Sequence, residues 1–103
     1  MIDHVKSPPT LDDLRARRDE ILQIAMHYGV SDIQIFGSVA RHEATPTSDI
    51  DLLVTFPPEF SLLRLSGLVG KLQQLLGCRV DVASADHLRD EFRDDILRDA
   101  VPL

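Results

Sequence analysis

Two aspartates one residue apart, Asp49 and Asp51, stand at the start of a hydrophobic segment that runs to Phe56. Side chains alternate along a β-strand, so both carboxylates are expected on one face of this strand. Aspartate is a poor strand residue, and two carboxylates on one face repel each other unless a cation lies between them. Hard divalent cations such as Mg2+ bind oxygen ligands of this kind. The pair therefore predicts a metal site.

A glycine–serine turn, Gly37 and Ser38, follows an earlier hydrophobic strand at residues 32–36. Glycine lets the backbone approach a phosphate closely, and the turn offers free backbone N–H groups and a hydroxyl. Arg41 stands one turn later and can reach the same anion, while Ser48 is expected to orient the start of the next strand. The alternatives are a plain strand-to-helix turn and, for Arg41, a surface ion pair with a nearby acid. A phosphate cradle near a metal site indicates phosphoryl or nucleotidyl transfer.

A third acid, Asp81, lies alone within the apolar segment 79–83. If this segment pairs with the strand of Asp49 and Asp51, all three carboxylates face one another. Nucleotidyl-transfer sites hold two cations about 3.5–4 Å apart, and a third carboxylate completes the side that activates the attacking hydroxyl. The alternative makes Asp49 a turn cap and the other two acids surface charges. The turn at Gly37 upstream favours the catalytic interpretation.

Composition limits the class of protein. The chain has 103 residues, 44% of them hydrophobic and 27% charged, which is typical of one soluble globular domain. No apolar run of about 18 residues is present, so no membrane span is expected. The net charge of −6 argues against direct binding of nucleic acid. The single Cys78 cannot form an internal disulfide, and a buried thiol in a reducing cytoplasm is expected.

Hydrophobic periodicity predicts alternating helices and strands. Residues 1–9 are expected to form a flexible N-terminal arm, and residues 10–103 a single domain. The expected helices cover residues 10–29, 38–42, 61–76 and 85–100, and the expected strands cover residues 32–36, 49–56 and 79–83. The order α-β-α-β-α-β-α predicts an α/β (α+β-like) class, with a small mixed β-sheet packed against helices. Leu88, Phe92 and Ile96 of the last helix are expected to fill the core.

Residues 36–41, 48–54 and 80–82, together with the ending 100–103, resemble the nucleotidyltransferase fold of the DNA polymerase β superfamily. The chain is more closely similar to the minimal nucleotidyltransferases that are encoded beside HEPN-domain proteins as toxin–antitoxin pairs. One departure is His42, which stands where the family commonly has glycine.

The resemblance implies a Mg2+-dependent antitoxin that transfers AMP from ATP onto a tyrosine of its partner, a HEPN-domain ribonuclease toxin. It also implies that Asp49, Asp51 and Asp81 are the catalytic residues, which would bind two Mg2+ ions, and that Gly37 and Ser38 hold the nucleotide triphosphate. Arg41 and Ser48, which lie near that turn in the sequence, complete the expected nucleotide-binding set. The short chain leaves no second domain to close over an acceptor, so the acceptor is expected to come from another chain.

Two alternatives remain at the level of sequence. The acidic surface and the missing acceptor domain also suit a binding-only antitoxin, which would neutralise its toxin by complex formation with a vestigial site. A metal-dependent phosphohydrolase would use the same carboxylates, but the glycine–serine turn suits a retained triphosphate better.

Overall fold

The computed structural model describes residues 7–103, and most of the predicted arm at residues 1–9 lies outside this part of the chain. Four strands form one sheet in the order β3-β2-β1-β4. They are β1 (Ser31–Phe36), β2 (Ile50–Thr55), β3 (Val80–Ser84) and β4 (Val101–Pro102). Strand β2 pairs with β1 in antiparallel and with β3 in parallel orientation, and β4 pairs with β1 in antiparallel orientation. The predicted small mixed sheet packed against helices is confirmed.

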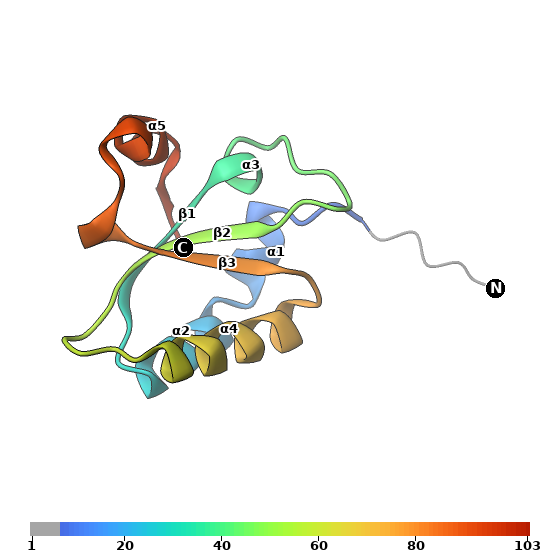
Figure 1. Cartoon of the computed structure of the whole chain (residues 1–103). Coiled ribbons are helices and arrows are strands. Elements are labelled where there is room, and N and C mark those ends of the chain that lie inside the picture. Colours follow the sequence, from blue (N-terminus) through green and yellow to red (C-terminus); the bar gives the residue numbers. More distant parts are fainter. Residues whose placement is uncertain (1–6) are drawn as a thin grey trace.

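Helices lie on both sides of this sheet (Figure 1). On one side are α1 (Leu11–Ala16), α2 (Arg18–His27) and α4 (Leu62–Leu76). On the other side are the single turn α3 (Gly37–Ala40) and α5 (Asp90–Asp99). None of the helices within residues 7–103 is long and apolar enough to cross a lipid bilayer.

The main core lies between the sheet and the helices α1, α2 and α4. Alternate residues of β2 point into it and meet leucines of α4 and apolar residues of α2. These residues are Ile50, Leu52, Val54, Leu68, Leu72, Ile21 and Ala25. Burying one such aliphatic side chain stabilises the fold by roughly 1.5–3 kcal/mol. Because the core fixes every second residue of β2, Asp51 between them must point to the opposite face of the sheet.

Three helix ends follow the local rules that the sequence suggests. The Thr10 hydroxyl accepts a hydrogen bond from the Asp13 N–H, and the Asp13 carboxylate accepts one from the Thr10 N–H, at 3.0 and 3.2 Å. The Ser61 hydroxyl accepts a hydrogen bond from the Arg64 N–H at the start of α4. Gly77 ends α4 with φ of +72°, a conformation that favours glycine.

The structure corrects two predicted elements. The helix expected over residues 10–29 is two helices, because Arg17 leaves the helical conformation with φ of −108° and ψ of 20°. The helix expected over residues 85–100 starts only at Asp90. A short 3-10 turn over Ala85–His87 comes first, and Leu88 and Arg89 are then extended.

Two further features were not anticipated. Phe92, expected in the core, is 53% exposed, and no residue of α5 is fully buried, so this acidic and basic helix covers the sheet only loosely. Strand β4 was missed because it has two residues, one of them Pro102, and gives no periodic signal. It nevertheless ties the end of the chain to the sheet, since Leu103 is buried.

Candidate active site

Asp51 and Asp81 lie directly opposite each other on the parallel strands β2 and β3. Opposite residues of paired strands share one face of the sheet, and neighbouring strands are about 4.8 Å apart. Strand alternation turns both carboxylates away from the main core. Asp49 immediately precedes β2 and is expected on the same face by alternation, but its Oδ1 lies 3.8 Å from the Nε of Arg79.

The electrostatics of Asp51 reflect its neighbours. Burial, followed by the charges of Asp81 and Asp49, raises the pKa of Asp51 from its ordinary value of 3.8 to about 6. Arg41 acts in the opposite direction and lowers the pKa of Asp51. The three carboxylates are therefore close enough to repel one another, and Arg41 is close enough to interact with them. A partly buried carboxylate with two acidic neighbours is a suitable position for a cation.

Gly37 brings the glycine–serine turn against Asp51. Its φ is +75°, and a Cβ atom added there would overlap with the Asp51 Oδ2. Phe36, the last residue of β1, is the register partner of Asp51. The buried side chain of Val39 anchors the short helix α3 that follows the turn. Only glycine at position 37 therefore lets this backbone approach the carboxylate without displacing it.

Arg41 ends α3 and makes two ion pairs. Its Nε donates to the Glu43 Oε1 at 2.8 Å, and its Nη1 donates to the Asp99 Oδ2 at 2.5 Å. The hydrogen bond to Glu43 and then that to Asp99 raise the already high pKa of Arg41. The surface ion pair between Arg41 and a nearby acid, which the sequence analysis gave as the alternative to phosphate binding, is therefore present. The partner at Asp99, 58 positions away, was not predicted.

The loop before β2 is closed by Ser48. Its hydroxyl accepts a hydrogen bond from the Thr45 N–H at 2.8 Å, and its N–H donates to the Thr45 carbonyl oxygen at 3.0 Å. Ser48 thus orients the approach to Asp49, and within residues 7–103 its hydroxyl makes no hydrogen bond to the three carboxylates. His42, the departure noted in the sequence, has φ of +61°, a left-handed conformation that favours glycine. Such a conformation costs a non-glycine residue roughly 1–2 kcal/mol.

Within residues 7–103, no three histidine, cysteine, aspartate or glutamate side chains converge closely enough to hold a metal ion. The Asp49 carboxylate lies instead near Arg79. The Arg79 side chain is 85% exposed and that of Asp49 is 41% exposed. Exposed pairs of this kind contribute about 0–1 kcal/mol, so turning Asp49 toward Asp51 costs little. The donor set of three carboxylates fits a hard divalent cation.

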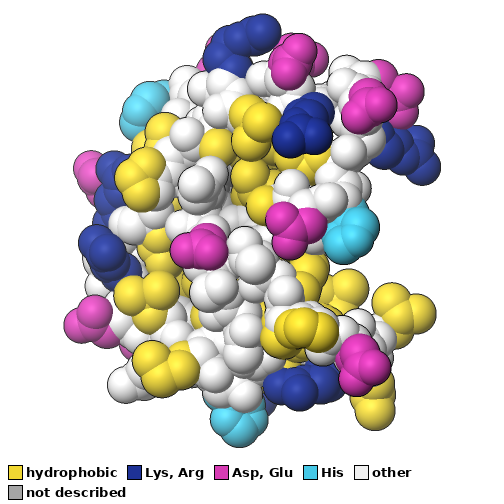
Figure 2. Space-filling view, turned by 90° about the vertical axis from the view of Figure 1, so that its left-hand side faces the viewer, with side chains coloured by type: hydrophobic (Ala, Val, Ile, Leu, Met, Phe, Trp, Pro, Cys, Tyr) yellow, Lys and Arg dark blue, Asp and Glu magenta, His cyan; other side chains and the backbone are white. Residues whose placement is uncertain are grey.

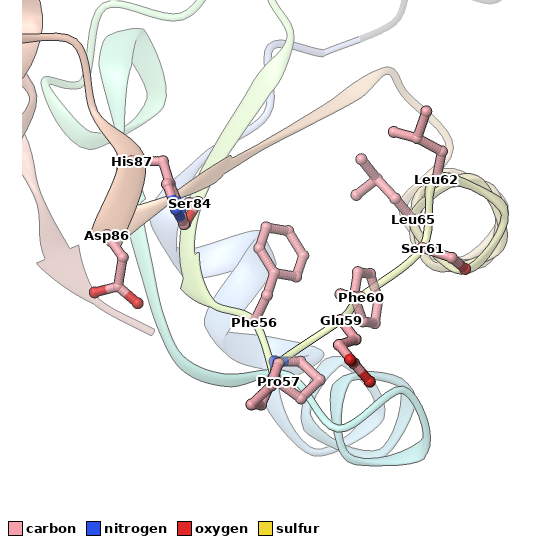
Figure 3. A pocket seen from close by; sticks show the side chains of 11 residues that line it. Phe56, Pro57, Glu59, Phe60, Ser61, Leu62, Leu65, Ser84, Asp86 and His87 are labelled. Carbon is pink, nitrogen blue, oxygen red and sulfur yellow. The ribbon is translucent and has the colours of Figure 1, made fainter.

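A separate groove of about 550 Å3 lies at the opposite ends of β2 and β3 (Figure 3). The rings of Phe56 and Phe60 stack at 4.8 Å between centroids, and the Ser84 hydroxyl lies 3.0 Å from the His87 Nδ1. Phe56 is roughly 16 Å along the strand from Asp51. More generally, one side of the molecule exposes hydrophobic side chains among charged side chains of both signs (Figure 2). The groove contains none of the residues that the sequence singled out.

Comparison with protein families gives one match over most of the chain. The model described as "Nucleotidyltransferase domain" matches residues 18–103. The "putative protein adenylyltransferase MJ0435" of Methanocaldococcus jannaschii is 43% identical over 82 residues, which are 80% of this chain and 88% of that protein. The protein adenylyltransferase MntA of Thermococcus cleftensis is 38% identical over 88 residues, which are 85% of this chain and 86% of MntA.

Solved structures give a consistent result. A "putative minimal nucleotidyltransferase" superposes with a TM-score of 0.79 at 43% identity, covering 92% of this chain and 97% of the other. A toxin–antitoxin structure with AMP-PNP superposes with a TM-score of 0.70, covering 82% of this chain and 69% of the other. The second pair is only 19% identical, so it supports the likeness in fold alone.

Proposed function

Because this chain belongs to the nucleotidyltransferase domain family, as its sequence motifs predict, we propose that it transfers AMP from ATP onto a hydroxyl group of a partner protein. One observation carries the proposal: the left-handed turn at Gly37 lies against Asp51, which faces Asp81 across two parallel strands. A backbone cradle for phosphate beside paired carboxylates is the arrangement that nucleotidyl transfer requires.

Asp49, Asp51 and Asp81 would hold Mg2+, the cation that suits their oxygen atoms. When bound, two such ions would lower the pKa of the attacking hydroxyl and stabilise the leaving pyrophosphate. The raised pKa of Asp51 supports this assignment, because burial and the charges of Asp81 and Asp49 both disfavour the ionised carboxylate in the protein alone. A cation would relieve the repulsion among them.

The chain's own residues would bind and orient the triphosphate. The turn at Gly37 and Ser38 offers backbone N–H groups and a hydroxyl, and Gly37 leaves space next to Asp51. Arg41 would donate hydrogen bonds to a phosphate oxygen. In the reaction, a bond forms between the acceptor oxygen and the α-phosphorus, and the bond to pyrophosphate breaks. The acceptor hydroxyl releases its proton.

The acceptor would lie on another protein. The relatives from Methanocaldococcus jannaschii and Thermococcus cleftensis are named protein adenylyltransferases, and related folds occur in toxin–antitoxin structures. The family resemblance suggests a tyrosine of a HEPN-domain ribonuclease toxin as the acceptor. In this proposal the chain is a cytoplasmic antitoxin that inactivates its partner by adding AMP.

The test is incubation of the protein with α-labelled ATP, Mg2+ and the HEPN-domain protein encoded beside it. We expect label on the partner with the wild-type chain and none with D49N or with EDTA. Absence of label with the wild-type chain would contradict the enzymatic proposal. A D49N chain that still neutralised the toxin in cells would instead support neutralisation by binding alone.

A further inference from the structure

We propose that Asp99 is a positioning residue of the nucleotide site, which holds the Arg41 guanidinium in the orientation that receives a phosphate group. This inference rests on the function proposed above. The Asp99 Oδ2 accepts a hydrogen bond from the Arg41 Nη1 at 2.5 Å, and the Glu43 Oε1 accepts one from the Arg41 Nε at 2.8 Å. Two carboxylates thus hold the guanidinium along two of its nitrogen atoms.

The third nitrogen of Arg41, Nη2, has no hydrogen-bond partner within residues 7–103. A guanidinium carries five N–H donors in a rigid planar fork, so fixing two nitrogens also fixes the direction of the third. Arg41 follows the Gly37 turn by one helical turn, and its charge acts on Asp51. The unpaired nitrogen is therefore available beside the turn and carboxylates where the triphosphate would bind.

Of the two carboxylates that pair with Arg41, Asp99 is the less exposed and the better fixed in position. Its side chain is 21% exposed, whereas that of Glu43 is 66% exposed. Asp99 is the last residue of α5, which packs against β1 and α3. Two residues later the chain pairs with β1 through β4, and Leu103 is buried. The end of the chain is anchored to the sheet, so the Asp99 carboxylate has a defined position relative to the site.

An arginine side chain that is already ordered favours nucleotide binding, because less conformational entropy is lost when the nucleotide binds. An arginine side chain has many rotamers, and a ligand that must order it loses part of its binding free energy. In this chain the ion pair with Asp99 has already ordered Arg41 before nucleotide arrives. The C-terminal helix and strand thereby contribute to nucleotide affinity without touching the nucleotide.

Isothermal titration with Mg2+ and a non-hydrolysable ATP analogue tests the inference. We expect D99N to weaken binding about fivefold, in the range that a partly exposed ion pair supports, and D99E to remain within about twofold of the wild type. D95N is the matched control, because Asp95 lies on the same helix and pairs with Arg98 at 3.3 Å instead of Arg41. Equal affinities for D99N and D95N, or tighter binding by D99N, would overturn the inference.

A double-mutant cycle separates positioning from a general effect on the fold. If Asp99 acts through Arg41, the D99N change should have no further effect on affinity in an R41Q background. A full fivefold loss in that background would overturn the inference.

The NMR signals of the Arg41 Nη1–H groups, which donate to Asp99, give a readout without nucleotide. Their hydrogen exchange should be slow in the wild type and in D95N and faster in D99N. Unchanged exchange in D99N would show that Asp99 does not hold Arg41. A wild-type chain that binds no Mg2+–nucleotide but shows this difference would refute the proposed function while confirming the contact itself.

Discussion

Replacing Asp51 by asparagine should stabilise the isolated protein while destroying its activity. Burial, together with the charges of Asp81 and Asp49, raises the pKa of Asp51 from 3.8 to about 6. The unfolded chain loses this proton near pH 4, whereas the folded chain keeps it until about pH 6. Stability therefore falls as the pH rises from about 4 to 6, and the loss persists at higher pH. Asparagine cannot ionise, so D51N avoids that loss.

The size of the effect follows from the change in pKa. A pKa raised from 3.8 to about 6 corresponds to at most about 3 kcal/mol of lost stability above pH 6. Solvent screening of a partly exposed carboxylate reduces this to about 1–2 kcal/mol. For a domain of this size, D51N should then raise Tm by about 5–10 °C at pH 7.5. At pH 4 the wild type and D51N should unfold at nearly the same temperature.

Urea unfolding or calorimetry at pH 4 and 7.5, without divalent cations, measures the difference. D94N serves as a control, because Asp94 is exposed and makes no ion pair within the described chain; its stability should change by less than about 0.5 kcal/mol. Added Mg2+ and nucleotide should raise the Tm of the wild type but not that of D51N. A D51N protein that is less stable than the wild type at pH 7.5, or equally stable at both pH values, would refute the electrostatic reasoning.

Three further changes test other parts of the account. G37A should lower the free energy of unfolding, measured with urea, by at least about 2 kcal/mol more than G77A does. Both glycines have positive φ, but only at Gly37 would the new Cβ overlap with Asp51. Equal losses of stability in the two variants would contradict this. D81N should abolish label transfer from ATP while circular dichroism remains unchanged, and full transfer would remove Asp81 from the site. L103A should lower the free energy of unfolding by about 2–4 kcal/mol, because Leu103 is buried in the core. A loss of stability below about 0.5 kcal/mol would show that Leu103 does not anchor this end of the chain.

Local rules explain which elements could be predicted. The strand alternation of β2 and the helix expected over residues 61–76 each depend on a few neighbouring residues, and both are present. The helix between β2 and β3 is long enough for a crossover connection, but the sequence did not fix the direction of the strands, which the structure shows to be parallel. That pairing places Asp81 opposite Asp51, as the lone acid in an apolar strand indicated, although the catalytic roles of these acids remain predictions.

Features that depend on distant parts of the chain could not be predicted. The Arg41–Asp99 pair joins residues 58 positions apart, and it requires the path that α5 takes above the sheet (Figure 1). The exposure of Phe92 has the same origin, because the sequence of α5 does not reveal how loosely the helix packs. A pattern of residue types and spacings points to Arg41 and the three carboxylates as candidates, whereas the tertiary path of the chain determines that Asp99 pairs with Arg41.

The most direct test of the central claim is a crystal structure with Mn2+ in place of Mg2+ and a non-hydrolysable ATP analogue. Anomalous scattering then locates the metal ions independently of the protein atoms. We expect manganese bound to carboxylate oxygens of Asp49, Asp51 and Asp81, with the triphosphate against the turn at Gly37. Manganese bound elsewhere, or nucleotide in the groove at Phe56 with none of these aspartates as a metal ligand, would contradict the account.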